Sequence, residues 1–353
     1  MSPRIAVIEG DGIGREVIPA AIRCVDAALE RHGGGLEWNR LDWSSERYLS
    51  DGSFIPEGGI SLLGAHDAIF LGAVGHPDIP DVETLWGLLI PIRREFEQYI
   101  NLRPVRALRG VPSPVRGGDD MDLVIVRENN EGEYSELGGR MFQGLDTEMA
   151  IQENVFTRRG IERVCRFAVA LAGARRGGLT SATKSNGIIH TMPFWDEIVG
   201  EVVAGAPGIR FEKVLIDALA AKLVLHPGGF DVIVASNLFG DILSDLAGAI
   251  AGSIGVAPSA NLNPERRHPS MFEPVHGSAP DIAGRGIANP IGAVWSGAMM
   301  LDHLGHAAAA ADLVRTFEAA VAEGARTPDL GGSATTEEVA SDIVDRLASN
   351  RSR

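Results

Sequence analysis

Short apolar runs that end in turn residues alternate along the chain with longer segments of helical periodicity. Apolar runs of about four to eight residues predict buried strands, whereas an apolar repeat about every three to four residues predicts an amphipathic helix. The predicted strands are residues 4–8, 68–71, 122–127, 179–183, 213–216 and 231–235, and the clearest predicted helices are residues 16–31, 307–322 and 337–347. This alternation predicts an α/β fold with a substantially parallel sheet.

A glycine-rich turn, residues 10–14, follows the first predicted strand and is similar to a dinucleotide-binding fingerprint. Its spacing does not fit that fingerprint. If Gly10 and Gly12 are the first two glycines of G-x-G-x-x-G, the third should stand at position 15, which is Arg15. We interpret the segment as a tight strand-to-helix turn, and the sequence predicts no Rossmann domain.

Composition places the chain among cytoplasmic globular proteins. Its 353 residues are enough for more than one lobe, and no apolar run reaches the length of a membrane span. The two cysteines, Cys24 and Cys165, are far apart, as expected in a reducing compartment. The net charge of −15 argues against nucleic acid as a partner, and neither a membrane span nor a signal peptide is predicted.

Two aspartates in the segment 237–246 form the sharpest chemical signal. Asp241 and Asp245 are four residues apart, so they share one face of the helix that the segment predicts. Apolar neighbours, among them Phe239 and Ile242, indicate partial burial, and a buried pair of like charges suits a hard divalent cation. The alternative is a solvated acidic first turn that complements the helix dipole.

Arginines and a polar loop add candidate substrate and proton-transfer groups. Arg93, Arg103 and Arg127 could together bind a di-acid, because guanidinium groups pair with carboxylates in a bidentate manner; the alternative is three separate surface ion pairs. Arg103 precedes Pro104, which we read as the end of an element. Tyr134, in the loop 128–135, could act as a general acid if nearby cations lower its pKa, or it could simply pack.

Two further charged residues follow predicted strands. Lys184 stands just after the strand 179–183, where a lysine removed from water could act as a base, although a surface lysine is the simpler alternative. Asp217 follows the strand 213–216 and could join a metal site. In the segment 272–282, Gly277 and Ser278 allow close approach to the backbone, and Asp281 could accept hydrogen bonds from a ribose; either Ser278 or Asp281 could also cap a helix.

These motifs together resemble the decarboxylating β-hydroxyacid dehydrogenases, the isocitrate and isopropylmalate dehydrogenase family, essentially from end to end. Residues 237–246 match the metal signature of that family, and residues 273–281 are similar to its adenosine-binding loop. Within the family, residues 85–87, 93–96, 183–186 and 258–266 are most similar to the D-malate and tartrate dehydrogenase branch.

The resemblance implies an α/β fold of the isopropylmalate dehydrogenase type, not a Rossmann fold. Two domains of mixed parallel and antiparallel sheets would enclose the active-site cleft. Residues 1–100 and 254–353 would form the large, cofactor-side domain, and residues 101–253 the small domain with the dimer contacts. Lys184 and Asp217 would enter the cleft from the partner subunit, which implies a homodimer with shared active sites.

The resemblance also assigns roles by position. Arg93, Arg103 and Arg127 would bind the substrate carboxylates, and Asp217, Asp241 and Asp245 would bind Mg²⁺ or Mn²⁺. Lys184 would take the hydroxyl proton while hydride passes to NAD, and Tyr134 would protonate the enol left by loss of CO₂. The residues expected to bind the cofactor are Glu273, His276, Gly277, Ser278, Ala279, Asp281 and Asn289. Relatives often use a monovalent cation such as K⁺, and the sequence leaves that requirement open.

Cofactor and substrate preference follow from two departures within the family. NADP-using isocitrate relatives carry lysine and tyrosine where Asp281 and Ile282 stand, so the carboxylate here predicts NAD. Isopropylmalate relatives shape their pocket with residues near 88–90, which include Leu89, and place a glutamate about where Trp86 falls. Trp86 is therefore predicted to fill that space and to select a compact four-carbon dicarboxylate, D-malate or tartrate.

Two alternatives to this function stay open at this point. The first is a 3-isopropylmalate dehydrogenase of leucine biosynthesis. The second is a catalytically silent binding or regulatory subunit, which would be expected to lack the catalytic tyrosine, the lysine or the metal carboxylates. All of these are present in the chain.

Overall fold

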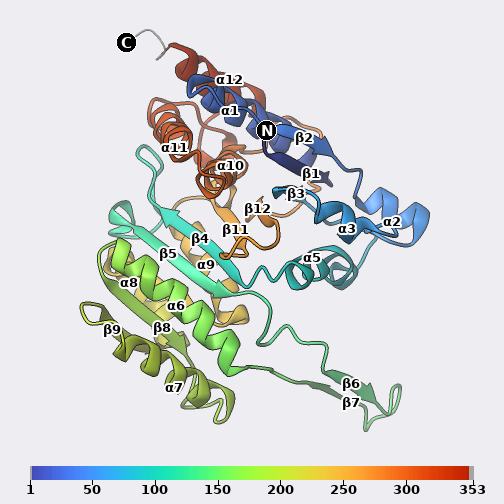
Figure 1. Ribbon diagram of the computed structural model, residues 1–353, viewed down its shortest axis with the longest axis vertical. Helices are drawn as coiled ribbons and strands as arrows, with labels where there is room; N and C mark the ends of the chain where they lie inside the picture. The colour runs from blue at the N-terminus through green and yellow to red at the C-terminus, as the bar shows by residue number, and fades with distance from the viewer. Residues whose placement is uncertain (1, 350–353) are drawn as a thin grey trace.

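One mixed β-sheet of ten strands runs through the molecule in the computed structural model, which describes residues 2–349 (Figure 1). The strand order is β2-β1-β3-β12-β11-β4-β5-β10-β8-β9, and β6 and β7 form a separate hairpin. The strands are β1 (Arg4–Gly10), β2 (Glu37–Arg40), β3 (Ala68–Ala73), β4 (Ile100–Arg106), β5 (Asp122–Glu128), β6 (Gly138–Met141), β7 (Met149–Gln152), β8 (Gly178–Thr183), β9 (Arg210–Leu215), β10 (Val232–Ala235), β11 (Pro258–Leu262) and β12 (Ser270–Pro274).

The two wings of the sheet are parallel and its centre is antiparallel. Strands β2, β1, β3 and β12 are parallel neighbours, as are β5, β10, β8 and β9. Between these wings, β11 and β4 are antiparallel to each other, β11 is antiparallel to β12, and β4 is antiparallel to β5. This arrangement confirms the predicted α/β class with mixed strand directions. The predicted domain boundaries near residues 100 and 254 would place the paired strands β11 and β4 in different domains. The assignment of two domains stays a prediction.

Helices cover the sheet on both faces. Helices α1, α10, α11 and α12 pack on one another beside β1, β3, β11 and β12, while α6 and α9 pack against β5 and β10 (Figure 1). The helices are α1 (Gly14–Arg31), α2 (Ser45–Asp51), α3 (Gly59–Leu63), α4 (Asp81–Thr84), α5 (Ile90–Glu95), α6 (Arg158–Ala174), α7 (Thr191–Ala204), α8 (Ile216–Leu225), α9 (Asn237–Ile250), α10 (Ile291–His303), α11 (Ala307–Ala322) and α12 (Thr336–Ser349). A π-helical segment, η1 (Leu85–Leu89), joins α4 to α5.

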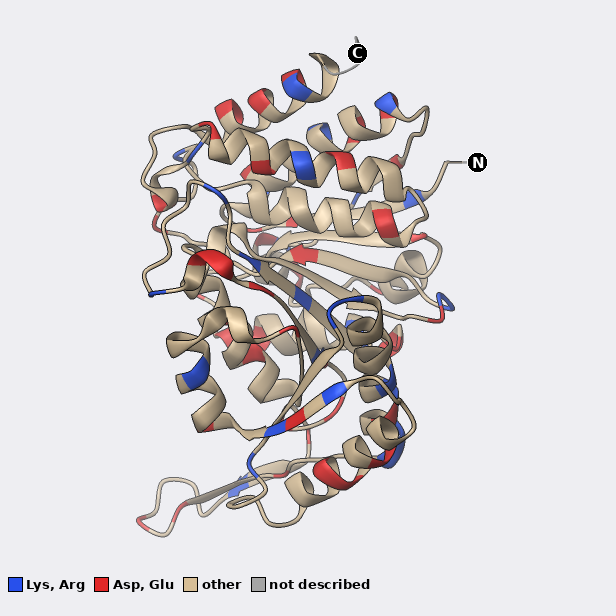
Figure 2. Cartoon of the chain, turned by 90° about the vertical axis from the view of Figure 1, so that its left-hand side faces the viewer, with Lys and Arg blue, Asp and Glu red and all other residues tan. Residues whose placement is uncertain are grey.

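No described helix is both long enough and apolar enough to cross a membrane. On the face drawn in Figure 2, acidic and basic residues are interspersed over the outer helices, which suits a strongly hydrated surface. The two cysteines, Cys24 and Cys165, are free thiols, as expected from their wide separation, and both are buried.

Strand periodicity divides the core between the two faces of the sheet. Along β1, Ile5 and Val7 join the larger apolar cluster with α1 and α10, whereas Ala6 and Ile8 point to a smaller cluster on the other face. This split follows from the alternation of successive side chains along a strand. The smaller cluster includes Leu88 and Ile92, and it therefore seats the helical segment that carries Arg93.

Every predicted strand and helix is present, with ends shifted by a few residues, but one expectation is wrong. Pro104 does not end an element; it lies inside β4, opposite Val124 of β5. Strand β11 pairs with β4 only as far as Leu102, so at Pro104 the strand has a neighbour on one side alone. A proline, which cannot donate a backbone hydrogen bond, is tolerated at such an edge.

Candidate active site

Helix α9 presents the two predicted metal ligands from one face. Asp241 and Asp245 lie one turn apart beyond the first turn of the helix, so the alternative of a solvated acidic first turn does not describe them. The side chain of Asp241 is 32% exposed and that of Asp245 is 55% exposed. The expected burial of Ile242 beside these aspartates is wrong, because its side chain is half exposed in the single chain.

Two buried arginines converge on the carboxylates of α9. Arg127, at the end of β5, donates from Nη1 to Asp241 Oδ1 and from Nε to Asn237 Oδ1 at 2.9 Å. Arg103, in β4, donates from Nη1 to Asp241 Oδ1 at 3.2 Å and to Asp245 Oδ1 at 3.4 Å. Both guanidinium groups are buried. They are therefore not the isolated surface pairs of the alternative interpretation.

The third predicted arginine, Arg93, is buried on α5 and is held by a carboxylate of its own. Arg93 Nη2 lies 3.0 Å from Glu273 Oε1 in β12, and Asn261 Nδ2 donates to the same oxygen at 2.7 Å. The positive charge of Arg93 also contributes to lowering the pKa of Asp241, which places it close to the α9 cluster. The structure thus brings Arg103 and Arg127 into contact with Asp241, while Arg93 pairs with Glu273. Glu273, predicted to bind cofactor, contacts Arg93.

A glycine makes the close approach of β5 and α9 possible. A Cβ atom on Gly240 would lie 2.6 Å from both Cβ and Cγ of Arg127, which is too close for any side chain to occupy. The residue that precedes Asp241 is therefore a glycine because Arg127 passes directly beside it.

Tyr134 joins this cluster from the loop after β5. Its hydroxyl donates to Asp241 Oδ2 at 3.0 Å, and Cζ of Arg127 lies 5.5 Å from the centre of its ring. The expectation that cations lower the pKa of Tyr134 is wrong for the described structure. Burial raises the pKa of this phenol, the carboxylate of Asp241 raises it further, and the opposing effect of Arg127 is smaller. The phenol therefore stays protonated at neutral pH and can donate a proton.

The pKa values of the two carboxylates on α9 are shifted in opposite directions. Burial raises the pKa of Asp241, but the guanidinium groups of Arg127 and Arg103 outweigh it, so its pKa is lowered overall. The pKa of Asp245 is raised, first by burial and also by the negative charge of Asp241, while Arg103 acts in the opposite direction. A pair of carboxylates with this imbalance fits a bound cation, which would stabilise the second negative charge.

Lys184 and Asp217 form a second, separate pair. Lys184 Nζ lies 2.7 Å from Asp217 Oδ1, and the two side chains are 31% and 66% exposed. Asp217 is in the first turn of α8, just after β9 ends at Leu215, and its hydrogen bond to Lys184 lowers the pKa of the Asp217 carboxyl. Within residues 2–349 of a single chain, no three His, Cys, Asp or Glu side chains are placed to hold a metal together.

The loop after β12 adjoins the turn after β1. Ser278 accepts a hydrogen bond from the backbone of Ile13 at 2.9 Å, and a Cβ atom on Gly12 would lie 2.0 Å from the Ser278 carbonyl oxygen. Gly12 also has a φ of 52°, so the turn requires glycine for its backbone conformation. The glycines of residues 10–14 thus serve the tight turn that the sequence analysis predicted.

Several side chains of this loop suit a ligand. His276 Nε2 is buried without a hydrogen-bond partner, and burial lowers the pKa of its imidazole. Gly277 and Asp281 are exposed, and Ala279 has an unusual φ of 42°. Asn289 is buried and accepts from the backbone of Ile291 at 3.0 Å, at the start of α10. The unpartnered nitrogen of His276 is the observation that best fits a nucleotide in this loop.

Trp86 and Leu89, the predicted substrate-pocket residues, lie on the π-helical segment η1. Both are half-buried, and the guanidinium carbon of Arg94 lies 5.1 Å from the centre of the Trp86 ring. Short π-helical segments occur often at functional sites. The placement leaves both roles as predictions.

Sequence reasoning missed several residues that hold this site together. Glu133 accepts hydrogen bonds from Ser236 Oγ at 2.8 Å and from the backbone of Leu238 at 3.0 Å, at the start of α9. Glu128 is fully buried beside Arg127, and burial raises the pKa of its carboxyl to about 7. The cluster of acidic residues in the loop 128–135 was a visible signal, but the carboxylates of Glu131 and Glu133 bind distant segments, whereas that of Glu128 accepts from the backbone of Asn130 and Glu131.

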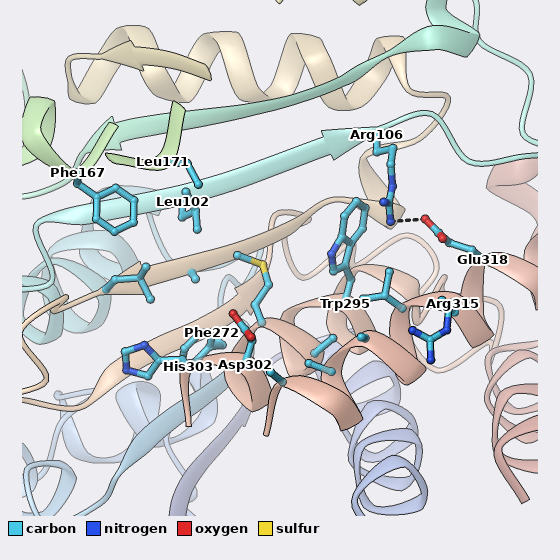
Figure 3. A pocket seen from close by; sticks show the side chains of 18 of the residues that line it. Leu102, Arg106, Phe167, Leu171, Phe272, Trp295, Asp302, His303, Arg315 and Glu318 are labelled. Atoms are coloured by element: carbon cyan, nitrogen blue, oxygen red, sulfur yellow. Dashed lines mark ion pairs between the residues drawn. The ribbon is translucent and has the colours of Figure 1, made fainter. Parts of the chain in front are cut away.

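A cavity of about 660 Å³ lies against β4, β11 and β12, on the face of β4 opposite to Arg103 (Figure 3). It is lined by Leu102 and Arg106 of β4, on either side of Arg103, and by apolar residues of α6, α10 and α11 that include Phe167 and Trp295. None of the predicted site residues lines it. The alternation of side chains along β4 thus separates this cavity from the cluster around Asp241.

Comparison with known proteins identifies close relatives. A sequence model of the isocitrate/isopropylmalate dehydrogenase family matches residues 4–345. A probable tartrate dehydrogenase/decarboxylase from Bacillus subtilis is 53% identical over 345 residues, which cover 97% of each chain. The D-malate dehydrogenase (decarboxylating) of Escherichia coli is 54% identical over 350 residues, which cover 96% of this chain and 97% of that protein. The crystal structure of isocitrate dehydrogenase from Methylococcus capsulatus matches with a TM-score of 0.89 at 34% identity, covering 98% of this chain and 99% of that chain.

Proposed function

The chain belongs to the isocitrate/isopropylmalate dehydrogenase family and is an enzyme of the decarboxylating dehydrogenase type, and we propose that it is an NAD-dependent, metal-dependent enzyme acting on D-malate, tartrate or both. The products would be a pyruvate-type keto acid, CO₂ and NADH. The observation that carries the proposal is the convergence of two buried arginines, Arg103 and Arg127, and the Tyr134 hydroxyl on Asp241, with the buried Arg93 paired to Glu273. The proposed site of action is the cytoplasm.

The arginines suit the two carboxylates of such a substrate. Arg103 and Arg127 each bond Asp241 in the single chain, while Arg93 is turned toward Glu273. Guanidinium groups on three different elements can bind a di-acid at both ends and fix its orientation. These three side chains bind the substrate and hold its C2 group beside α9.

Asp241 and Asp245 would hold Mg²⁺ or Mn²⁺, since carboxylate oxygens are the donors that such hard cations prefer. A bound divalent cation supplies Lewis-acid polarisation of a substrate oxygen and compensates negative charge. The third aspartate, Asp217, lies apart from this pair and is two-thirds exposed. In our proposal it reaches the site of a partner subunit.

Lys184 and Tyr134 are the proposed proton-transfer groups. Lys184 Nζ, as the free amine, would accept the proton of the substrate hydroxyl, and a bound NAD would supply the hydride acceptor of the reaction. The hydroxyl of Tyr134 then donates a proton to the carbon that has lost CO₂. Burial and Asp241 raise the pKa of this phenol, so the proton to be donated is in place at neutral pH.

A homodimer is proposed because the chain exposes apolar surface where a second copy would fit. The β6–β7 hairpin projects from the body of the molecule (Figure 1), and every residue of both strands is exposed. Residues 137–151, which form the hairpin and its tip, include the exposed apolar side chains Leu137, Met141, Phe142, Leu145, Met149 and Ile151. Apolar surface of this kind on an exposed hairpin marks an association site. Sharing Lys184 and Asp217 between subunits would make the dimer necessary for activity.

NAD is the proposed cofactor, and the loop 276–281 is its proposed adenosine site. The unpartnered Nε2 of His276 can hydrogen-bond a base, and the exposed carboxylate of Asp281 can accept from ribose hydroxyls. A 2′-phosphate would be repelled by the same carboxylate. K⁺ binding is not part of the proposal.

The substrate assignment rests on Trp86 and on the names of the relatives. The relatives from B. subtilis, E. coli and Pseudomonas putida are named tartrate or D-malate enzymes, the last being 52% identical over 356 residues. Trp86 and Leu89 would limit the pocket to a four-carbon acid. The alternative substrate, 3-isopropylmalate, carries a branched group that a tryptophan at this position would exclude.

Initial rates with D-malate, the tartrates, 3-isopropylmalate and isocitrate, each with NAD and Mn²⁺, test the proposal. We expect turnover of D-malate or a tartrate, loss of activity with a chelator, and poor use of 3-isopropylmalate. Comparable turnover of 3-isopropylmalate would reject the substrate assignment, and no NADH from any acid would favour a silent regulatory subunit. The double substitution Asp281→Lys with Ile282→Tyr should shift preference toward NADP if the cofactor assignment is correct.

A further inference from the structure

Arg94 makes three contacts that no role assigned so far explains. Its Nη2 donates to the backbone oxygen of Tyr134 at 3.0 Å, and its Nη1 lies 2.9 Å from Glu136 Oε2. Its guanidinium carbon also lies 5.1 Å from the centre of the Trp86 ring. One side chain thus touches the residue predicted to select the substrate and the residue predicted to donate the proton.

The helical segment is built so that Trp86 and Arg94 can meet. They stand eight residues apart in sequence, on a continuous helical path made of η1 and α5. A π turn contains more residues than an α turn, so a π segment changes which residues share a face. The adjacent Arg93 points into the protein toward Glu273, whereas the Arg94 side chain is 32% exposed. Arg93 and Arg94 therefore serve different purposes.

The contacts of Arg94 continue directly to the reacting groups. It binds the main chain of Tyr134, and the hydroxyl of that residue bonds Asp241, which in turn bonds Arg127 and Arg103. The loop 131–136 is also held by the carboxylates of Glu131 and Glu133 and, at Ser135, by hydrogen bonds to Gln152 and Glu153. Arg94 holds the loop from the opposite side, through a helix seated on the smaller core cluster.

We propose that Arg94 is a positioning residue that couples the substrate-size determinant Trp86 to the loop that places the Tyr134 phenol. The inference rests on the proposed function, because it assumes that Trp86 contacts the substrate. A planar guanidinium can stack on the indole and donate to two acceptors at the same time. Displacement of Trp86 by an oversized substrate moves Arg94, and Arg94 then releases the main chain of Tyr134. Substrate fit is in this way linked to proton donation.

The test is Arg94→Lys, with Glu136→Gln as its matched control. Lysine keeps the positive charge but cannot stack flat and donate to two acceptors at once. We expect kcat for D-malate to fall about tenfold, since charged hydrogen bonds of this kind carry on the order of that factor. The KM for NAD should not change, and the preference for D-malate over 3-isopropylmalate should weaken. Glu136→Gln keeps the stack and the bond to Tyr134, so its rates should stay within about twofold of the wild type.

Two further measurements separate coupling from a general structural defect. In a double-mutant cycle, Trp86→Phe combined with Arg94→Lys should cost little more than Arg94→Lys alone, because residues that act as a unit are not additive. Amide hydrogen exchange over residues 131–136 should also speed up in Arg94→Lys and not in Glu136→Gln. Additive effects with unchanged substrate preference would overturn the proposal, as would wild-type exchange in Arg94→Lys. If the wild type turned over no hydroxy acid, the proposed function would fail, while the exchange result would still decide whether Arg94 holds the loop.

Discussion

The two charged clusters of this chain differ in how completely one subunit builds them. Around Asp241, the side chains of Arg103 and Arg127 are almost wholly buried, and Tyr134 completes the hydrogen bonding. Around Asp217, by contrast, one lysine makes one ion pair, and the carboxylate is 66% exposed. The first cluster is organised before any ligand binds, whereas the second has unoccupied bonding capacity that faces outward.

This difference indicates which charged side chains a single chain can bury. An ion cluster taken out of water needs several partners to offset its desolvation, and β4, β5 and α9 provide them from one chain. An exposed pair needs no such support and contributes little to stability. In the proposed dimer, a group that serves another subunit has to be accessible at the surface, and the side chains of Lys184 and Asp217 are 31% and 66% exposed.

Complementation between inactive variants should give the largest effect and tests the comparison directly. Lys184→Met and Tyr134→Phe should each lose about 10²- to 10⁴-fold in kcat, as expected for removal of a proton-transfer group. If the subunits share sites, a dissociated and reassociated mixture should recover about a quarter of wild-type activity, because half of the dimers then have one intact site. The measurement is NADH formation from D-malate with Mn²⁺ before and after mixing.

A mixture of Lys184→Met with Asp217→Asn is the control for that experiment. Both residues would enter the same site from the same subunit, so no mixed dimer contains an intact site and no activity should return. No recovery in the Lys184→Met and Tyr134→Phe mixture would show that each site is built within one chain. Recovery in the control would show that Lys184 and Asp217 do not enter the same site from the same subunit.

Unfolding of two aspartate variants gives the second, smaller effect. Asp241→Asn should lower the free energy of unfolding by about 2 kcal/mol, because it leaves the guanidinium groups of Arg103 and Arg127 short of a counter-charge. Asp217→Asn should leave it unchanged, since that ion pair is solvated. Urea titration in the presence of a chelator measures both. Equal losses in the two variants would contradict the contrast between a buried and an exposed cluster.

Sequence patterns predicted those parts of the site that depend on local spacing. The four-residue interval between Asp241 and Asp245 specified a shared helix face, and the structure confirms it. The glycine turn at residues 10–14 was likewise predictable, because a near-match to the fingerprint had a residue with a bulky side chain at its third position. Periodicity thus predicted β1, β3, β5, β8, β9 and β10 and the shared helix face of the two aspartates, but it did not predict β4, β11 or β12.

Long-range contacts and net electrostatics could not be predicted in this way. Arg93 bonds Glu273 across 180 residues of sequence, and no local pattern indicates that pairing. The pKa of Tyr134 is raised because burial and the carboxylate of Asp241 together outweigh the opposing charge of Arg127, and this balance depends on the tertiary structure. The prediction that an element ends at Pro104 was wrong because β4 can contain a proline only where β11 no longer pairs with it, and the sequence does not show where that pairing stops.

Removal of the Glu133 side chain, which caps α9, should give the smallest effect. It tests whether the buried cluster around Asp241 depends on the residues that hold the start of α9. Glu133 accepts from Ser236 Oγ and from the backbone of Leu238, so it satisfies the first turn of the helix that carries Asp241. Glu133→Ala should cost about 1 kcal/mol of unfolding free energy, the usual effect of losing a helix cap. It should also weaken Mn²⁺ binding severalfold, because the start of α9 is less firmly placed.

Glu131→Ala is the matched control, since the two glutamates lie in one loop and serve two different helices. Glu131 accepts from the backbone of Thr157 at 2.8 Å and so supports the start of α6, which carries no predicted metal ligand. Its loss should destabilise the chain by a similar amount, about 1 kcal/mol, while Mn²⁺ affinity stays at the wild-type value. Calorimetric titration of both variants with Mn²⁺ compares them. Equal metal affinity would mean that Arg127, through Asn237, positions α9 without help from Glu133.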